Sequence, residues 1–531
     1  MPSECIPFRD TNYFSTLICD YLEEKPELKQ FYNRFPKLGN FEAQLEEKKQ
    51  SFPSGHRQVL VEVLRDQYKG ISISETTGKN INSLERNTSF TITTGHQLNL
   101  FTGPLYFLYK IVSTINLAKK LKEEYPENDF IPVYWMATED HDFEEINYFN
   151  LFGKKIQWAH KEGGAVGVFD TEELDAVYTI FSSEIGLGKN AEQLKDLFEK
   201  AYLKHMNLSD ATRYLTNELF KEYGLVVIDA DDTRLKQLFT PVMEQELVEQ
   251  IAYNTVLPKA KRLRDLGYKV QVNPREINLF YLSKGIRERI IKKKGDYFVN
   301  ETEISWSKSD ILEELSEFPE RFSPNVMMRP LYQEVILPNL CYIGGGGELA
   351  YWMELKDYFE SVSVPFPILL LRNSVLIQTE KQAEKVKKLN ISDRELFLKQ
   401  HELINRKVRQ ISNIEIDFTT QREYLRDQFK EMYELANQTD VSFVNAVKAQ
   451  EVKQLKGIDV LEKRLLKAQK IKLSDQVKRL TIIQNELFPN NSLQERHTNF
   501  SEMYLEYGEG LIPTLIKQLN PLLSEFLIIK T

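Results

Sequence analysis

The stretch ITTGHQLNLFTGPLYFLYK, residues 92–110, contains the end of an expected strand, a sharp turn and the start of an expected helix. Before the turn, residues 89–94 form a β-branched run that is typical of a buried strand. After it, apolar residues recur at helical spacing over residues 105–122. A second apolar run, residues 130–136, is long enough for another buried strand. Strand, turn, helix and strand make one βαβ unit, which predicts a parallel sheet and an α/β fold.

Later apolar runs fit further strands of the same sheet, at residues 224–228, 269–272 and 366–371. The long spacing between them indicates inserted segments, which we expect at about 148–215 and 275–325. The sequence therefore predicts a core domain over residues 1–380 with two insertions.

From about residue 380 the composition changes, because Gly and strand signals vanish while Lys, Glu, Gln and Leu dominate. A polar turn at 437–440 separates two helical stretches, which predicts an antiparallel hairpin or a short coiled coil over 381–490. Its expected seam consists of Val444, Val447, Ile458, Leu461, Leu465 and Ala468. This arm could pair two copies of the chain or act as an internal strut. Residues 491–531 are expected to pack back on the core or on the arm.

The composition excludes several classes of protein. The chain has 531 residues and a formal charge of −9, with 42% hydrophobic and 28% charged residues, which is ordinary for a folded soluble protein. Its three cysteines, Cys5, Cys19 and Cys341, form no C-x-x-C pair, so a disulfide framework or a cysteine-rich zinc module is not expected. No signal peptide and no membrane span are recognisable, because the most apolar stretch, 364–377, is short and interrupted. We expect a cytoplasmic protein.

The charge is unevenly distributed along the chain. Residues 380–480 hold 22 Lys and Arg against 16 Asp and Glu, so the arm is positive while the whole chain is negative. Such an arm could bind nucleic acid, but no tight run of like charge occurs. A solvated face of mixed charges is therefore the preferred interpretation, and a nucleic-acid-binding module remains an alternative function.

The turn after the first strand carries a candidate catalytic residue, His96. Gly95 allows a close approach of backbone to a ligand, and a His at the end of a parallel strand lies at the ligand-binding edge of such a sheet. The order Thr93-Thr94-Gly95-His96 resembles the His-x-Gly-His signature of class I aminoacyl-tRNA synthetases, with Thr93 in place of the first His. In those enzymes the imidazole stabilises charge on a phosphate. An ordinary turn is the alternative.

A second cluster follows the second strand, because five carboxylates and one His come soon after Trp135-Met136: Glu139, Asp140, His141, Asp142, Glu144 and Glu145. Carboxylates and a His at this place could bind an ammonium group, act as a base or hold a metal. The alternative is an acidic helix start that the helix dipole favours.

Together these segments resemble the bacillithiol biosynthesis cysteine-adding enzymes, a family of cysteine ligases. The resemblance includes TGHQ and FTGPLYFLYK, and it continues through residues 132–146, 273–280, 323–333, 337–338, 342–344, 347–352 and 367–374. It implies a Rossmann-like catalytic core with inserted connecting segments and a C-terminal coiled coil that forms a homodimer. The implied reaction couples L-cysteine to the amine of glucosaminyl malate.

An amide can form only from an activated acyl group, so we expect ATP or another nucleotide to generate a cysteinyl adenylate. The residues expected to act on it are His96, Thr94, Gln97, Asp140, His141 and Asp142. Asp140, His141 or Asp142 would anchor the cysteine ammonium or deprotonate the sugar amine. The malate carboxylates require cations, for which Arg275, Arg329 and Arg372 are candidates, or these arginines form structural ion pairs. Further expected substrate-binding residues are Gly95, Trp135, Glu139, Asn278, Tyr342, Gly344, Glu348 and Tyr351.

The nucleotide step has no motif of its own. The sequence contains no P-loop, no Lys-x-Ser-Lys signature after the last strand and no cysteine-rich zinc site. No metal ligand is therefore assigned. A synthetase-like nucleotidyltransferase or ligase that acts on another amino acid or amine remains an alternative.

Overall fold

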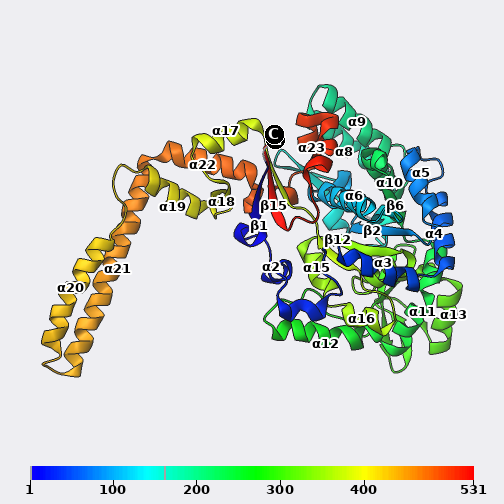
Figure 1. The fold of residues 1–531 in the computed structure, drawn as a ribbon, viewed down its shortest axis with the longest axis horizontal. Coiled ribbons are helices and arrows are strands. Elements are labelled where there is room, and N and C mark those ends of the chain that lie inside the picture. Colours follow the sequence, from blue (N-terminus) through cyan, green and yellow to red (C-terminus); the bar gives the residue numbers. More distant parts are fainter. Residues whose placement is uncertain (1–2, 161–162, 531) are drawn as a thin grey trace. The chain divides into compact units, whose positions relative to one another are not determined.

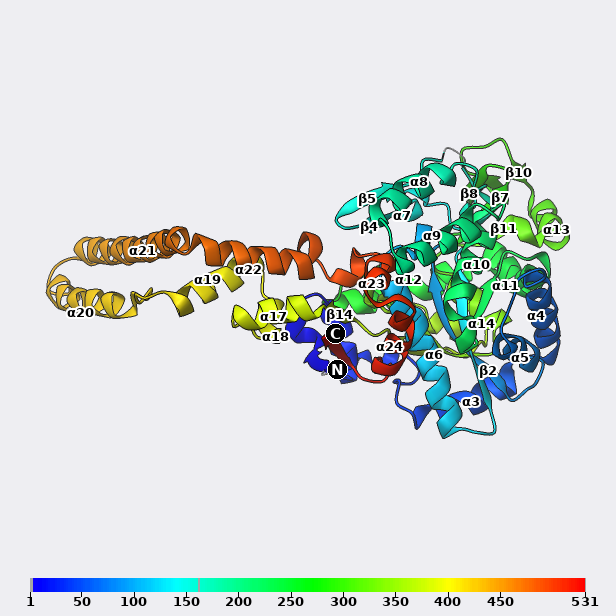
Figure 2. The same ribbon diagram turned by 90° about the horizontal axis from the view of Figure 1, so that it is seen from above.

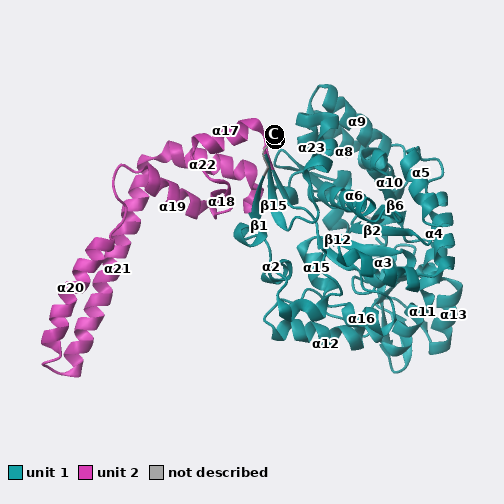
Figure 3. Ribbon diagram, viewed as in Figure 1, with its two compact units in different colours: residues 1–376, 493–529 teal, residues 377–492, 530–531 magenta. Residues whose placement is uncertain are grey.

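The computed structural model describes residues 3–160 and 163–530. The chain divides into two compact units, shown in Figure 3. The core unit comprises residues 1–376 and 493–529, and the helical unit comprises residues 377–492 with 530–531. Among the described residues, no helix combines the length and the apolar character that crossing a bilayer requires.

A five-stranded parallel sheet forms the centre of the core unit (Figure 1), as the sequence predicts. Each strand of this sheet has at least one buried face. Strands β2 and β3 pair over their whole lengths, from Ser89 opposite Asp129 to His96 opposite Met136. In spatial order the strands are β13 (Ile368–Leu371), β12 (Asn339–Gly344), β2 (Ser89–His96), β3 (Asp129–Met136) and β6 (Val226–Asp229).

Two parts of the sheet differ from the sequence prediction. Residues 269–272 are not a strand: they alternate between exposed and half-buried positions, and the N–H of Gln271 donates to the Glu354 side chain at 2.9 Å instead of to a neighbouring strand. Strand β12, which lies between β13 and β2, was not predicted, although all six of its residues are buried. Its short Asn-Leu-Cys-Tyr-Ile-Gly sequence has neither a β-branched run nor a period-2 alternation.

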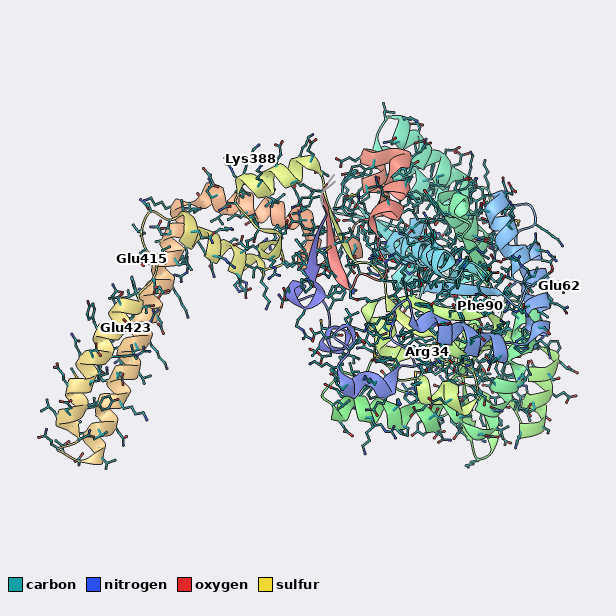
Figure 4. The ribbon with its side chains drawn as sticks, in the orientation of Figure 1. Arg34, Glu62, Phe90, Lys388, Glu415 and Glu423 are labelled. Atoms are coloured by element: carbon teal, nitrogen blue, oxygen red, sulfur yellow. The ribbon has the colours of Figure 1, made fainter. Side chains whose placement is uncertain are left out.

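Helix α6 (Tyr106–Glu124) is the crossover between β2 and β3 and packs on both strands. Its apolar residues recur at helical spacing, and the helix ends just before Pro126. Phe90, labelled in Figure 4, and Ile92 of β2 share one buried cluster with Leu117 and Leu121 of α6. This cluster fixes the helix, and with it the turn after His96, against the sheet.

The N-terminal part of the core unit is helical, apart from one strand. Strand β1 (Ser3–Pro7) pairs antiparallel with β15 (Glu525–Lys530), which comes from the other end of the chain. The helices that follow are α1 (Phe8–Thr11), α2 (Thr16–Leu22), α3 (Asn40–Ser51), α4 (Ser54–Gln67) and α5 (Glu75–Ser83).

Two long segments interrupt the sheet. Between β3 and β6 lie α7 (Phe143–Ile146), the hairpin of β4 (Tyr148–Leu151) and β5 (Lys154–Gln157), α8 (Leu174–Ile185), α9 (Lys189–Tyr202) and α10 (Leu208–Phe220). Between β6 and β12 lie α11 (Thr233–Glu249), α12 (Ile251–Asp265), α13 (Lys308–Glu317), α14 (Arg329–Ile336) and an antiparallel sheet. Its strands, in the order β10-β9-β8-β7-β11, are Ser305–Trp306, Asp296–Val299, Ile286–Lys293, Leu279–Ser283 and Phe322–Pro324.

After β12 come α15 (Gly346–Trp352), α16 (Lys356–Ser361), β13 and β14 (Val375–Gln378). The chain returns to the core unit at residue 493 with α23 (Phe500–Tyr507) and α24 (Leu511–Gln518). Helix α24 packs on α6, where the Asn116 amide donates to the carbonyl of Leu519 at 2.6 Å. This return brings residues close to position 496 into the core unit.

The helical unit contains α17 (Glu380–Lys388), α18 (Asp393–Leu396), α19 (Gln400–Ile411), α20 (Thr419–Ala436), α21 (Val441–Lys472) and α22 (Ser474–Leu487). Figure 2 shows α20 and α21 side by side as a hairpin, which confirms the predicted turn. Phe429, Ala436 and Val447 are buried in its seam. The predicted heptad is wrong at Leu461, which is 55% exposed, and at Ala468, which is also exposed, while Leu466 and Gln469 are buried instead.

Candidate active site

A cavity of about 720 Å³ opens at the carboxyl ends of the parallel strands. Because parallel strands end at the same edge of a sheet, the residues after β2, β3, β12 and β13 meet there. The antiparallel sheet of the second insertion closes another side through Phe280 of β7 and through Arg287 and Arg289 of β8. The two turns that the sequence analysis singled out thus line a single cavity.

His96 lines this cavity in a neutral form. Its side chain is only 8% exposed, and its ring lies against Tyr106 and Phe107 at centroid distances of 5.4 and 5.1 Å. Burial, together with the nearby charges of Lys110 and Arg372, lowers the pKa of His96 well below its usual value. Its Nε2 atom is buried and has no hydrogen-bond partner within the described parts of the chain. The imidazole is therefore uncharged at neutral pH.

Gly95 is needed for close packing beneath the cavity. A Cβ at this position would lie 3.2 Å from the Tyr342 hydroxyl and 3.7 Å from Nη1 of Arg329. The Gly95 carbonyl accepts a hydrogen bond from Lys110 Nζ at 2.7 Å. The absence of a side chain thus lets the Tyr342 hydroxyl and the Arg329 guanidinium approach the end of β2.

Lys110 and Glu348 form a buried ion pair that joins two edges of the cavity. Lys110 Nζ lies 2.7 Å from Glu348 Oε2, and the Glu348 carboxylate also accepts from the Tyr342 hydroxyl and the Gly345 N–H, both at 2.7 Å. Burial opposes ionisation of Glu348, but the Lys110 charge and these hydrogen bonds lower its pKa overall. Lys110 therefore ties the end of β2 to the glycine loop that precedes α15.

Asp140 is held as a carboxylate. Its Oδ2 accepts from the Gln97 amide at 2.9 Å, and its Oδ1 accepts from the His141 N–H at 2.8 Å. Burial opposes ionisation, but the hydrogen bonds from His141 and Gln97 and the charge of Arg287 lower the pKa of Asp140 well below its usual range. Its neighbour Glu139 is held by the buried Lys236. Asp140 can bind a cation but is a weak base.

His141 is fixed by an arginine from the insertion. Nη1 of Arg287 lies 2.7 Å from His141 Nδ1, and the guanidinium sits 4.1 Å above the centre of the Phe280 ring. Because a guanidinium can only donate, His141 Nδ1 accepts this hydrogen bond. Arg287 thus occupies one of the two ring nitrogens of His141.

Positive side chains outnumber the negative ones around the cavity. The cations are Lys110, Arg275, Arg287, Arg289, Arg329, Arg372 and Arg496. Arg372 is neutralised, because its Nη2 lies 2.8 Å from the buried carboxylate of Glu495. Arg329 is half-buried, with its guanidinium near the rings of Trp135 and Tyr342, and its hydrogen bonds go to Gln333 and Tyr351. Five arginines have no carboxylate within ion-pair distance among the described residues: Arg275, Arg287, Arg289, Arg329 and Arg496, of which Arg287 bonds to His141 instead. The cavity is suited to an anionic ligand.

Most of the residues predicted from the sequence line the cavity. They are Gly95, His96, Gln97, Trp135, Glu139, Asp140, His141, Arg275, Arg329, Tyr342, Glu348, Tyr351 and Arg372. Four do not, and each has a local reason. The Thr94 hydroxyl donates to the Ile343 carbonyl at 2.7 Å, and the Asn278 amide donates to Glu246 at 2.8 Å. Gly344 packs beneath the Tyr342 ring, and Asp142 is exposed outside the lining.

The sequence analysis missed several lining residues, among them Tyr106, Lys110, Arg287, Arg289 and Arg496, whereas Glu145 belonged to the acidic cluster without an assigned role. Tyr106 and Lys110 are four residues apart and so share one face of α6, a signal that helical spacing could have given. Arg287 and Arg289 are two residues apart on β8 and share one face of that strand. Arg496 follows from no local pattern. Among residues 3–160 and 163–530, no three His, Cys, Asp or Glu side chains are grouped to hold a metal.

Comparisons with known proteins give one consistent family. The model described as "Bacillithiol biosynthesis BshC, N-terminal Rossmann-like domain" matches residues 1–373, and "Bacillithiol biosynthesis BshC, C-terminal coiled-coil domain" matches residues 375–531. A protein of Christiangramia forsetii named "Putative cysteine ligase BshC" is 63% identical over 100% of this chain and 99% of its own length. A Flavobacterium johnsoniae protein of the same name is 59% identical over 100% of both chains.

A more distant relative of the same name, from Chlorobaculum tepidum, is 29% identical over 96% of this chain and 95% of its own length. Among solved structures, one titled as an arginyl tRNA synthetase from Campylobacter jejuni covers 84% of this chain and 97% of its own. Its sequence identity is 11% and its TM-score is 0.19, a likeness too small to support any argument.

Proposed function

The chain belongs to the BshC family of bacillithiol biosynthesis, whose members are ligases, and we propose that it joins L-cysteine to the amine of glucosaminyl malate. The observation that carries this proposal is the single cavity in which a neutral imidazole, a firmly ionised carboxylate and five arginines without a carboxylate partner meet. Amino acid, nucleotide and malyl substrate are all anionic in part, and the amino acid and the amino sugar are also cationic.

We propose that the reaction begins with adenylation of cysteine by ATP. A carboxylate oxygen of cysteine attacks the α-phosphorus, the bond between the α- and β-phosphates breaks, and pyrophosphate leaves. The sugar amine then attacks the cysteinyl carbonyl, forming the C–N bond, while AMP leaves with the bonding electron pair and the amine loses a proton. The unpaired guanidinium groups of Arg289, Arg275 and Arg329 support this assignment, because guanidinium groups bind phosphate oxygens in pairs.

Asp140 is the proposed site for the cysteine ammonium. Its carboxylate stays ionised because Gln97 and the His141 N–H both donate to it, and it lies at the end of β3 beside Trp135. The same low pKa argues against Asp140 as the base that deprotonates the sugar amine. Asp140 thus has a binding role in this proposal.

His96 is the proposed partner of the reacting phosphate. A neutral imidazole can donate one N–H to an oxygen anion. Because the ring carries no charge, its burial avoids the cost of desolvating a cation. The packing of its ring between Tyr106 and Phe107 holds it in place before substrate arrives. This is the role expected from the synthetase-like turn, performed by an uncharged His.

The direct test combines the purified full-length protein with cysteine, ATP and glucosaminyl malate, and measures bacillithiol and AMP. Formation of both in equal amounts supports the proposal. If another amine is acylated while glucosaminyl malate is not, the chain is a ligase with a different substrate and the proposal is wrong. The reaction would occur in the cytoplasm, where ATP and cysteine are both present.

We also propose that the α20–α21 hairpin pairs with a second copy of the chain. Large apolar side chains remain exposed along it, among them Tyr424 at 68%, Leu435 at 65%, Val441 at 76% and Phe443 at 51%. Exposed apolar groups in such number on one hairpin favour a protein–protein contact. Sedimentation analysis of the protein and of a Leu435→Ser, Phe443→Ser variant tests this. A dimer that the substitutions dissociate supports the proposal, and a monomeric parent protein contradicts it.

A further inference from the structure

A second cavity, of about 300 Å³, lies next to the main cavity in the core unit. Gln97, Tyr106, Glu145 and Arg496 line both cavities, so the two meet at these side chains. We call this place the junction and the smaller space the side cavity. Of its lining residues, the sequence analysis predicted Gln97 as a site residue and placed Glu145 in the acidic cluster after the second strand.

Away from the junction, the side cavity is lined mainly by neutral groups that can form hydrogen bonds. Asn99 and Asn150 contribute amides, and Tyr148 contributes a phenol and an aromatic face. Asn99 is only 8% exposed; its Nδ2 donates to the Glu145 carbonyl at 3.2 Å, while its buried Oδ1 has no hydrogen-bond partner in the described chain. A buried acceptor without a partner indicates that a ligand or water donates to it. Amides, a phenol and an aromatic face together suit a polyhydroxylated ring.

The junction holds one positive and one negative side chain that do not pair with each other. Arg496 has no carboxylate within ion-pair distance in the parts of the chain that the structure describes. Glu145 accepts one hydrogen bond, from the Gln97 amide at 2.9 Å, and its remaining acceptor positions face no described cation. A ligand that carries an ammonium and a carboxylate close together would satisfy both residues.

We propose that the side cavity is the sugar subsite, and that Arg496 and Glu145 bind the malyl carboxylate and the amine of glucosaminyl malate. This inference rests on the proposed function. In glucosaminyl malate the amine and the malyl group stand on adjacent ring carbons, so both reach the junction together. The opposite edge of the ring, which carries hydroxyl groups, then enters the side cavity towards Asn99 and Tyr148.

This placement divides the two cavities between the two half-reactions. The main cavity holds the nucleotide and cysteine, beside Asp140 and His96, while the sugar amine waits at the junction. From the junction the amine can attack the activated cysteinyl carbonyl in the main cavity. The hydroxyl groups of the sugar are held in the side cavity, away from that carbonyl. The sequence analysis expected Arg372 to bind malate, but its charge is neutralised by Glu495. In this proposal Arg496 binds the malyl carboxylate instead.

The test measures binding of glucosaminyl malate to the full-length protein by isothermal titration calorimetry, which needs no turnover. The variants are Arg496→Gln and the conservative Tyr148→Phe. The matched control is Arg262→Gln, an arginine of α12 that is 57% exposed and lines neither cavity. A second ligand, methyl glucosaminide, carries the amine without the malyl group.

Loss of a charged contact predicts that Arg496→Gln binds glucosaminyl malate about 10- to 100-fold more weakly, with methyl glucosaminide nearly unaffected. Tyr148→Phe should weaken the binding of glucosaminyl malate and of methyl glucosaminide about 2- to 10-fold, and Arg262→Gln should change the binding of neither. Binding of ATP and cysteine should stay within about twofold of the parent protein in every variant.

Two outcomes overturn the inference in different ways. If the parent protein binds glucosaminyl malate and both variants bind it equally well, the sugar lies elsewhere, and the proposed function stands. If the parent protein does not bind glucosaminyl malate at all, the proposed function and this inference both fail.

Discussion

Replacing Lys110 by Met removes one half of the buried ion pair at the end of β2. Lys110 is 3% exposed, and its Nζ is bonded to Glu348 and to the Gly95 carbonyl. Removal of one partner of a buried pair costs roughly 3–5 kcal/mol, because the other charge stays uncompensated. The Glu348 side chain is 26% exposed and keeps its bonds from Tyr342 and Gly345, so we expect a loss of about 3 kcal/mol.

Urea unfolding followed by tryptophan fluorescence measures this loss in the core unit alone. All four tryptophans belong to that unit: Trp135, Trp158, Trp306 and Trp352. The double variant Lys110→Met, Glu348→Gln should recover part of the lost stability, because no charge is then left unpaired. Lys119→Met, on the exposed side of the same helix, is the matched control and should change the free energy of unfolding by less than about 0.5 kcal/mol.

The loss should also depend on pH in a definite direction. In the parent protein the pKa of Glu348 is lowered, so its contribution to stability is present above the carboxyl's unfolded pKa, about 4.3, and declines as the pH falls through the folded value. Without Lys110 the folded pKa of Glu348 rises, and the destabilisation grows as the pH rises above about 4.3. A Lys110→Met variant as stable as Lys119→Met at pH 8 would refute this account of the pair.

His96→Ala should abolish bacillithiol formation with a small change in melting temperature, and a variant that loses both equally would make His96 a structural residue. Because the pKa of His96 is lowered, the ring is already uncharged at pH 6, and its titration should not reduce product formation between pH 6 and pH 8. A decline over this range that disappears in His96→Gln would show that the parent ring loses a charge there, and would contradict an uncharged His96. Arg372→Met should destabilise the core unit by about 3–5 kcal/mol, since Glu495 is then buried alone, and urea unfolding checks this. Arg329→Met should instead weaken the binding of ATP about 10-fold or more in calorimetry. Little stability should be lost, because Arg329 has no carboxylate partner among the described residues. Because the pKa of Asp140 is lowered in the folded state, its carboxylate stabilises the fold above about pH 3.9, and this contribution to the free energy of unfolding is lost on further acidification. Asp140→Asn should therefore make the free energy of unfolding depend less on pH in the acid range.

The sequence was sufficient for those parts of the fold that have a strong local period. Strands β2 and β3 and helix α6 were predicted because their apolar residues form continuous runs or recur at helical spacing. Strand β12 was missed because its six residues carry neither signal, and its burial results from neighbours on both sides. Residues 269–272 carry the alternation of a strand but find no partner strand.

The site was predictable to the extent that it follows from strand ends. His96 is the last residue of β2 and Asp140 lies in the turn after β3, and parallel pairing brings both to one edge. Arg287 comes from the insertion and Arg496 from beyond the helical unit in sequence, so only tertiary structure brings them to the cavity. The role of Arg372 could not be read locally either, because its partner Glu495 is more than one hundred residues away.

The central claim, that this cavity joins cysteine to an amine through an adenylate, is tested most directly by following oxygen. Cysteine labelled with ¹⁸O in its carboxylate is incubated with the protein, ATP and glucosaminyl malate, and the products are analysed by mass spectrometry. The account predicts one labelled oxygen in AMP and none in pyrophosphate for each bacillithiol formed. Label in inorganic phosphate, or bacillithiol formed without labelled AMP, would contradict it.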